Sequence, residues 1–145
     1  IKILGNTPLL NDLIDKKNYI NLKLTSNTFV SKNFSYVKEF IKINKRLNFN
    51  LLEVHNRPSY INQILKSNTK IKLVIIFHNN PISLGGSKTL YERKFLLEKC
   101  DKLLFVSNWV KERFFEGFDK KDHHKCEVIY PSVVPLKKFP KKKIK

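Results

Sequence analysis

The chain has 145 residues, of which 41% are hydrophobic, and a formal net charge of +17. This length allows one domain with a substantial core and excludes two ordinary domains. Its apolar runs are far shorter than the roughly 20 residues that cross a bilayer, and two cysteines are too few for a disulfide framework. We therefore expect a single cytoplasmic domain, either soluble or peripheral to the inner face of the membrane.

The positive charge would by itself suggest an anionic partner such as nucleic acid or a membrane surface. However, the chain contains 25 Lys, 15 Asn and 14 Ile, three residue types whose codons are rich in A and T. Part of the lysine excess can therefore reflect base composition. Apart from a cluster after residue 136, the lysines are scattered along the chain, which fits either a solvated surface or a surface that faces anionic lipid.

The first half of the sequence predicts two strand-helix pairs. A strand is expected over residues 19–24. Apolar residues then recur at helical spacing from residue 34 to residue 47. A short strand follows over residues 50–55, and Pro58 is placed to open a helix that runs to about residue 66.

The most distinct strand is expected over residues 71–78. Its continuous hydrophobic run from Leu73 to Phe77 is typical of a central parallel strand. After a loop, Thr89 and Glu92 have the spacing of a capping box, which predicts a helix that ends near residue 101.

The rest of the chain continues the alternation. The expected elements are a strand over residues 102–106, a helix from 108 to about 116 with Gly117 as its stop, and a strand over 126–130. Strands that alternate with helices through short connections predict an α/β fold with a doubly wound, mostly parallel, Rossmann-like sheet.

In such sheets, ligands bind at the carboxyl ends of the strands. Polar groups gather at these ends, in the segments His55-Asn56-Arg57-Pro58, His78-Asn79-Asn80-Pro81, Ser107-Asn108-Trp109 and Tyr130-Pro131-Ser132. Two of these segments run directly into the starts of predicted helices, where free N–H groups and the helix dipole favour an anion such as phosphate. The sequence therefore predicts a binding site along this edge.

Each of these residues also has a purely structural interpretation. Asn56 and Ser107 have side chains that commonly cap helices, and a cap can also contact a ligand. His55 and His78 can be packing histidines, or neutral imidazoles that bond substrate hydroxyls and respond to developing charge. Both interpretations stay open for all four residues.

Two other motifs carry less weight. The run from Gly85 to Thr89 does not match a phosphate-binding P-loop, which needs a glycine directly before the lysine, so we expect a flexible substrate loop there. His123, His124 and Cys126 are crowded together and lack a distant fourth ligand, so no metal site is expected.

Four segments, taken together, resemble family 4 glycosyltransferases. They are LLEVHNRPS over residues 51–59, IIFHNNP over 75–81, CDKLLFVSNWVKERFF over 100–115 and EVIYPS over 127–132. They cover roughly the last hundred residues in the order and spacing of that family. The resemblance implies a GT-B enzyme, in which two Rossmann-like domains face each other across a cleft.

The resemblance also implies an activity and a set of site residues. Such an enzyme transfers a hexosyl or similar group from a nucleotide-sugar donor, with retention and without a metal or other cofactor, to a glycan or lipid-linked acceptor. The family often acts in cell-surface polysaccharide or lipopolysaccharide synthesis. His55 corresponds to the histidine that reaches the transferred sugar, so it is the expected catalytic residue. The expected substrate-binding residues are Asn56, Arg57, His78, Asn79 and Ser107.

By the same resemblance, residues 1–135 form the N-terminal, acceptor-side domain, with its first strand missing, and residues 136–145 form a basic interdomain linker. The C-terminal, donor-binding domain is expected to be absent, which would leave this chain without activity on its own. A basic nucleic-acid-binding module and a non-catalytic Rossmann-like domain are the alternatives. The eleven Phe mostly fit inward-facing positions, so no nucleic acid partner is expected.

Overall fold

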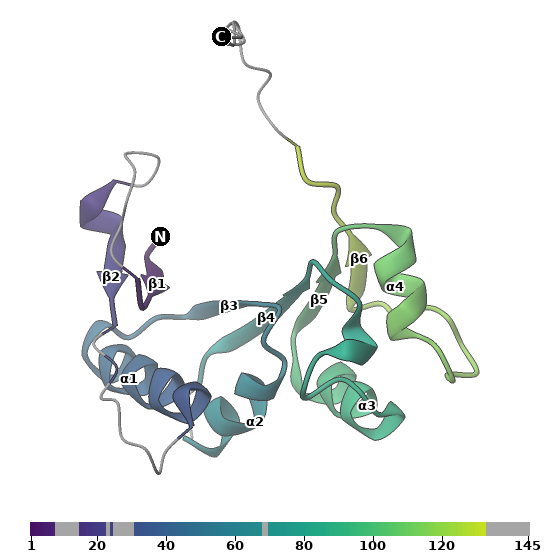
Figure 1. Cartoon of the computed structure of the whole chain (residues 1–145), viewed down its shortest axis with the longest axis horizontal. Helices are drawn as coiled ribbons and strands as arrows, with labels where there is room; N and C mark the ends of the chain where they lie inside the picture. The colour runs from purple at the N-terminus through teal and green to yellow at the C-terminus, as the bar shows by residue number, and fades with distance from the viewer. Residues whose placement is uncertain (8–14, 23, 25–30, 68–69, 133–145) are drawn as a thin grey trace, which may run out of the picture.

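A computed structural model describes residues 1–7, 15–22, 24, 31–67 and 70–132 (Figure 1). Four parallel strands form the main sheet in sequential order. They are β3 (Leu51–His55), β4 (Lys72–Phe77), β5 (Lys102–Phe105) and β6 (Cys126–Val128). The structure thus confirms the α/β class and the parallel sheet. The expected linker over residues 136–145 lies outside the described residues.

Four helices connect and cover these strands. They are α1 (Lys32–Leu47), α2 (Ser59–Lys66), α3 (Leu90–Lys99) and α4 (Asn108–Phe114). All four contribute side chains to one hydrophobic core, and α1, α2 and α3 lie below the sheet in Figure 1. Right-handed crossovers between strands in sequential order place the connecting helices on the same face. The three helices that connect these strands, α2, α3 and α4, therefore share one face of the sheet, and α1 packs beside α2.

Short polar motifs set the helix starts. Ser31 begins α1, where its Oγ accepts a hydrogen bond from the N–H of Phe34 at 3.2 Å. Thr89 and Glu92 form the expected capping box at the start of α3. These caps satisfy backbone N–H groups that have no partner within the helix.

A second, two-stranded sheet lies beside α1. β1 (Ile3–Gly5) pairs in parallel with β2 (Tyr19–Asn21), which follows the 3-10 helix η1 (Lys16–Asn18). The sequence predicts β2, as part of a longer strand over residues 19–24, but it does not predict β1. The hydroxyl of Tyr36 on α1 donates a hydrogen bond to the carbonyl of Leu4 at 2.6 Å, which attaches this small sheet to the helix.

Aromatic side chains fill the core between the sheet and α4. Phe77 on β4 and Phe105 on β5 stack with their ring centroids 5.5 Å apart, and Phe114 on α4 packs on both rings. The thiols of Cys100 and Cys126 are buried nearby in the same core, and burial raises the pKa of each to about 12. Both cysteines are thus packing residues.

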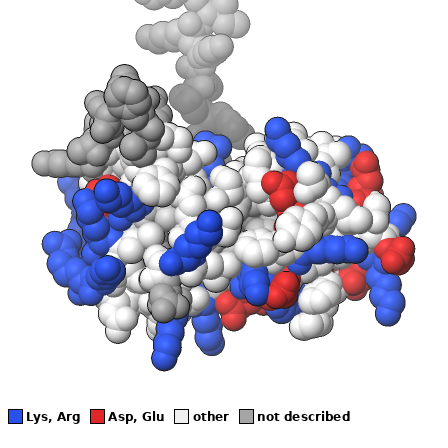
Figure 2. Space-filling view, turned by 90° about the horizontal axis from the view of Figure 1, so that it is seen from below, with Lys and Arg blue, Asp and Glu red and all other residues white. Residues whose placement is uncertain are grey.

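Charge is unevenly distributed over the helix-covered face. Figure 2 shows lysine and arginine gathered on the left of this face, below α1, whereas acidic and basic side chains mix on the right. Among the residues that the structure describes, no helix has both the length and the apolar character needed to cross a membrane.

Candidate functional site

The carboxyl ends of the four strands lie side by side at one edge. His55 is the register partner of Ile76 on the neighbouring strand. Beyond the strand ends, the N–H of Val106 donates to the carbonyl of Phe77 at 3.1 Å, and the N–H of Ile129 donates to the carbonyl of Phe105 at 2.8 Å. The polar segments that follow these strands are therefore neighbours in space.

His55 and His78 form a direct pair at this edge. The Nδ1 atom of His55 lies 2.9 Å from the Nε2 atom of His78, and the two rings stack with centroids 5.2 Å apart. Desolvation, and then the proximity of His55, lower the pKa of His78 below its usual 6.5. A single hydrogen can bridge the two nitrogens only when at least one ring is neutral, and the lowered pKa of His78 favours the neutral form of that ring.

Asn56 holds the ends of β3 and β4 together. Its Oδ1 accepts hydrogen bonds from the N–H groups of His78 at 2.8 Å and Asn79 at 3.3 Å, and its own N–H donates to Ile76. Its φ of 52° is left-handed, a conformation that asparagine adopts more readily than most residues. Asn56 therefore does not cap α2, although its side chain was considered as a helix cap from the sequence. Instead, it fixes His78 beside His55.

Ser107 is a helix cap, which is the structural role considered for it from the sequence. Its Oγ accepts a hydrogen bond from the N–H of Val110 at 3.3 Å, so Ser107 caps α4. It stands one strand further along the edge than His78. Arg57 is exposed. Arg57 and His55 both line a cavity of about 900 Å³ between β1, α1 and β3.

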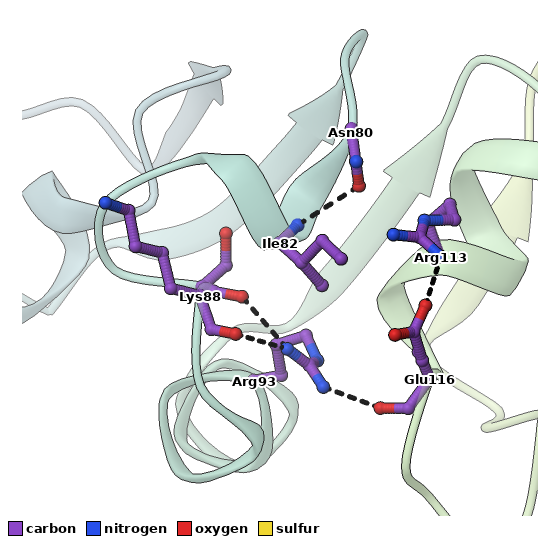
Figure 3. Close-up of polar contacts among 7 residues, drawn as sticks. Asn80, Ile82, Lys88, Arg93, Arg113 and Glu116 are labelled. Carbon is purple, nitrogen blue, oxygen red and sulfur yellow. Dashed lines mark hydrogen bonds and ion pairs between the residues drawn. The ribbon is translucent and has the colours of Figure 1, made fainter.

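The loop after His78 is held in place by a buried arginine that sequence reasoning missed. Arg93 on α3 is only 4% exposed. Its Nη1 donates to the carbonyls of Ser87 at 3.3 Å and Lys88 at 2.8 Å, and its Nη2 donates to the carbonyl of Glu116 at 2.6 Å (Figure 3). Arg93 lies one helical turn before the buried Leu96, a spacing that could have placed it on the inner face.

The same loop is pressed against the start of α2. Gly86 has a φ of +91°, and a Cβ added to it would lie 2.4 Å from the backbone nitrogen of Ser59. Ser87 is fully buried, and its hydroxyl donates to the carbonyl of Pro81 at 2.6 Å. At the other end, the side chain of Asn80 caps the 3-10 helix η2 (Pro81–Ser83), as Figure 3 shows. The loop that was expected to be flexible is therefore fastened to α2, α3 and α4.

The arrangement offers a compact set of hydrogen-bonding groups. Two imidazoles and the exposed amide of Asn79 stand together on a braced turn, and Arg57 adds a fixed positive charge beside them. Neutral imidazoles and amides both donate and accept hydrogen bonds, as a ligand with many hydroxyl groups requires. Of the predicted site residues, the structure brings together His55, Asn56, His78 and Asn79, with Arg57 adjacent.

The sequence of this chain matches a known protein family. The family model of Glycosyltransferase Family 4 matches residues 11–135, which is most of the chain and includes every residue of this edge. No curated protein matches the sequence.

Proposed function

This chain belongs to Glycosyltransferase Family 4, and from that premise we propose that it is the acceptor-side domain of a two-domain enzyme. The enzyme transfers a sugar from a nucleotide-sugar donor to a glycan or lipid-linked acceptor, with retention, in cell-surface polysaccharide or lipopolysaccharide synthesis. The observation that carries the proposal is the His55–His78 pair, with a nitrogen–nitrogen distance of 2.9 Å, at the carboxyl edge of the sheet.

His55 is the proposed catalytic residue. A glycosyl group in transfer develops positive charge at its ring, and its hydroxyls then become better hydrogen-bond donors. The Nε2 atom of His55 lies 3.8 Å from the carboxylate of Glu53, while its Nδ1 is engaged by His78. The contact through Nδ1 holds the ring, and Nε2, too far from Glu53 for a hydrogen bond, is left to contact a sugar hydroxyl.

The neighbouring residues have distinct proposed roles. His78 and Asn79 bind acceptor hydroxyls, and Asn56 positions them through its bonds to both backbone N–H groups. The exposed guanidinium of Arg57 binds a phosphate group, for which a planar fork of donors is well suited. Ser107 lines the same edge while it caps α4.

Peripheral attachment to an anionic membrane is part of the proposal, because a lipid-linked acceptor is held there. The basic surface near α1 supports it (Figure 2). The 145 residues alone should not turn over a nucleotide sugar, because the groups that stabilise the leaving diphosphate would belong to the donor-binding domain.

The test uses the enzyme that carries this domain together with its donor-binding domain. Nucleotide release from a panel of nucleotide sugars is measured for His55→Ala and His78→Ala. We expect His55→Ala to lower kcat on the order of a hundredfold, with a smaller effect on the donor KM. His78→Ala should act mainly on the acceptor KM.

A matched control separates catalysis from folding. His124→Ala removes an exposed histidine in the segment before β6, and it should leave kcat and Tm unchanged. A His55→Ala enzyme that is folded and fully active would remove His55 from the site. A lowered Tm with normal activity per folded molecule would make His55 a packing residue.

A further inference from the structure

Two large aromatic side chains stand exposed at the same edge as the histidine pair. Trp109 is 56% exposed and Tyr130 is 69% exposed. One exposed aromatic side chain needs no explanation, but two on adjacent segments of a binding edge indicate a contact surface. Neither residue has a role in the function proposed above.

The backbone holds these rings next to the histidine site. Trp109 lies in the first turn of α4, which Ser107 caps, and Tyr130 lies two residues after the end of β6. The side-chain N–H of Asn108 donates to the hydroxyl oxygen of Tyr130 at 3.1 Å. Since the segment after β5 lies beside the end of β4, this group follows His78 along the edge.

The chemistry of these side chains matches a sugar ring. A pyranose presents C–H groups on its faces and hydroxyls around its rim, so it can stack on an aromatic ring and bond to polar groups beside it. Trp109 and Tyr130 supply the rings. The Tyr130 hydroxyl accepts from Asn108 and keeps its own hydrogen to donate.

We propose that Asn108, Trp109 and Tyr130 form a sugar-binding subsite, which holds a neutral pyranose unit of the acceptor glycan next to the unit at the His55–His78 pair. The proposal rests on the proposed function, because it names the acceptor as a chain of at least two sugars. It gives the acceptor a direction, from β4 towards β6 along the edge.

The local charge favours a neutral ligand over a nucleic acid. Base stacking on aromatic side chains is usually combined with a strongly positive groove that follows the phosphates. Residues 88–130 carry ten basic and eight acidic residues, so this half of the domain is close to neutral. The positive charge lies instead towards α1 (Figure 2).

Trp109 is the only tryptophan in the 145 residues, so its fluorescence reports this subsite directly. The chain is titrated with maltose, cellobiose and chitobiose, with glycerol as the control for viscosity and hydroxyl content. We expect a saturable change in emission with at least one disaccharide, with a Kd on the order of 1 mM. No saturable change with any of them would overturn the proposal.

Tyr130→Ala keeps the reporter and should weaken binding about fivefold. Tyr91→Ala is the matched control, since Tyr91 is 79% exposed on α3, away from the edge. Equal weakening in both variants would contradict the assignment. An emission spectrum that shifts with protein concentration in the absence of sugar would instead show that Trp109 packs against a second protein surface, which would also overturn it.

The two proposals can fail separately. Tyr130→Ala in the two-domain enzyme should raise the acceptor KM while kcat changes little. Disaccharide binding without glycosyl transfer would refute the proposed function and leave the subsite. Transfer with an unchanged acceptor KM in Tyr130→Ala, and no fluorescence response, would refute the subsite alone.

Discussion

The halves of the domain on either side of β4 differ in charge and in cross-bracing. Residues 32–72 carry nine basic and two acidic residues, whereas residues 88–130 carry ten and eight. In the second half, Arg93 ties α3 to the turn that follows α4, through the carbonyl of Glu116. In the first half, the small sheet is attached to α1 through the Tyr36 hydroxyl.

The site lies where these halves meet, and it draws on both. The loop after His78 is fixed from the α3–α4 side by Arg93 and rests on the start of α2. Positive charge that can attract phosphates or lipid lies on the α1 side (Figure 2). The elements that brace the site therefore differ from those that carry most of the positive charge.

The largest expected effect concerns the buried aromatic side chains that pack α4 against the sheet. Phe114 is fully buried and contacts the rings of Phe77 and Phe105, so Phe114→Ala should lower the free energy of unfolding by about 3–5 kcal/mol. Phe34→Ala on α1, where the ring is 50% exposed, should cost less than about 1 kcal/mol. Urea unfolding of both variants measures this. Similar losses would mean that the ring of Phe114 contributes no more to stability than an exposed one.

The next effect concerns the bracing itself. Arg93→Met keeps much of the side-chain volume but removes the donors to three carbonyl groups, which should cost about 3 kcal/mol. Lys94→Met, at the exposed neighbouring position, should be nearly neutral. Hydrogen exchange of the amides of residues 79–89 would follow the loop directly. Unchanged protection in Arg93→Met would show that Gly86 and Ser87 hold the loop without it.

The charge difference predicts a smaller effect on membrane binding. Lys38→Ala with Lys45→Ala removes two exposed cations from α1, and at low salt it should weaken binding to anionic liposomes about thirtyfold, at about 1 kcal/mol for each lysine. The paired control changes the exposed Lys88 and Lys94 at the α3 side. Liposome sedimentation compares them. Equal binding to neutral vesicles, or an equal loss in the control, would contradict an α1-directed surface.

The smallest effect arises at the junction of the halves. Because the native pKa of His78 lies below 6.5, the unfolded chain binds more protons, so stability should fall as the pH drops below about 6.5 and level off below the native pKa. His78→Gln should flatten this part of the profile of Tm against pH. His55→Ala should raise the His78 pKa measured by NMR, and an unchanged value would argue against coupling of the two rings.

Much of the fold follows from local pattern, whereas the bracing does not. The continuous apolar run of β4 and the capping box at Thr89 each indicate an element within a residue or two of its observed bounds. Ser107 behaves as a cap because the next residues continue as a helix. Asn56 does not, because its Oδ1 meets N–H groups 22 and 23 residues away, and contacts of that range leave no periodic trace in one sequence.

The candidate site, too, could be predicted from the sequence only in part. The sequence places His55 and His78 at neighbouring strand ends, because carboxyl ends of parallel strands share an edge. Their contact through Nδ1 and Nε2 depends on the turn at Asn56 and could not be read from spacing. Arg93 was missed because an arginine in a helix is usually solvated, and its carbonyl partners on Ser87, Lys88 and Glu116 reach it only through tertiary folding.

Cys100 and Cys126 make the chain a convenient background for site-specific labelling. Both thiols are buried, and with pKa values of about 12 they are almost wholly protonated at neutral pH, so they react slowly while the fold is intact. A cysteine introduced at an exposed position such as Tyr91 would then take up a maleimide dye alone. In the unchanged chain, the rate at which the two native thiols are modified reports how often the core opens. Mass spectrometry can follow this rate at protein concentrations too low for calorimetry.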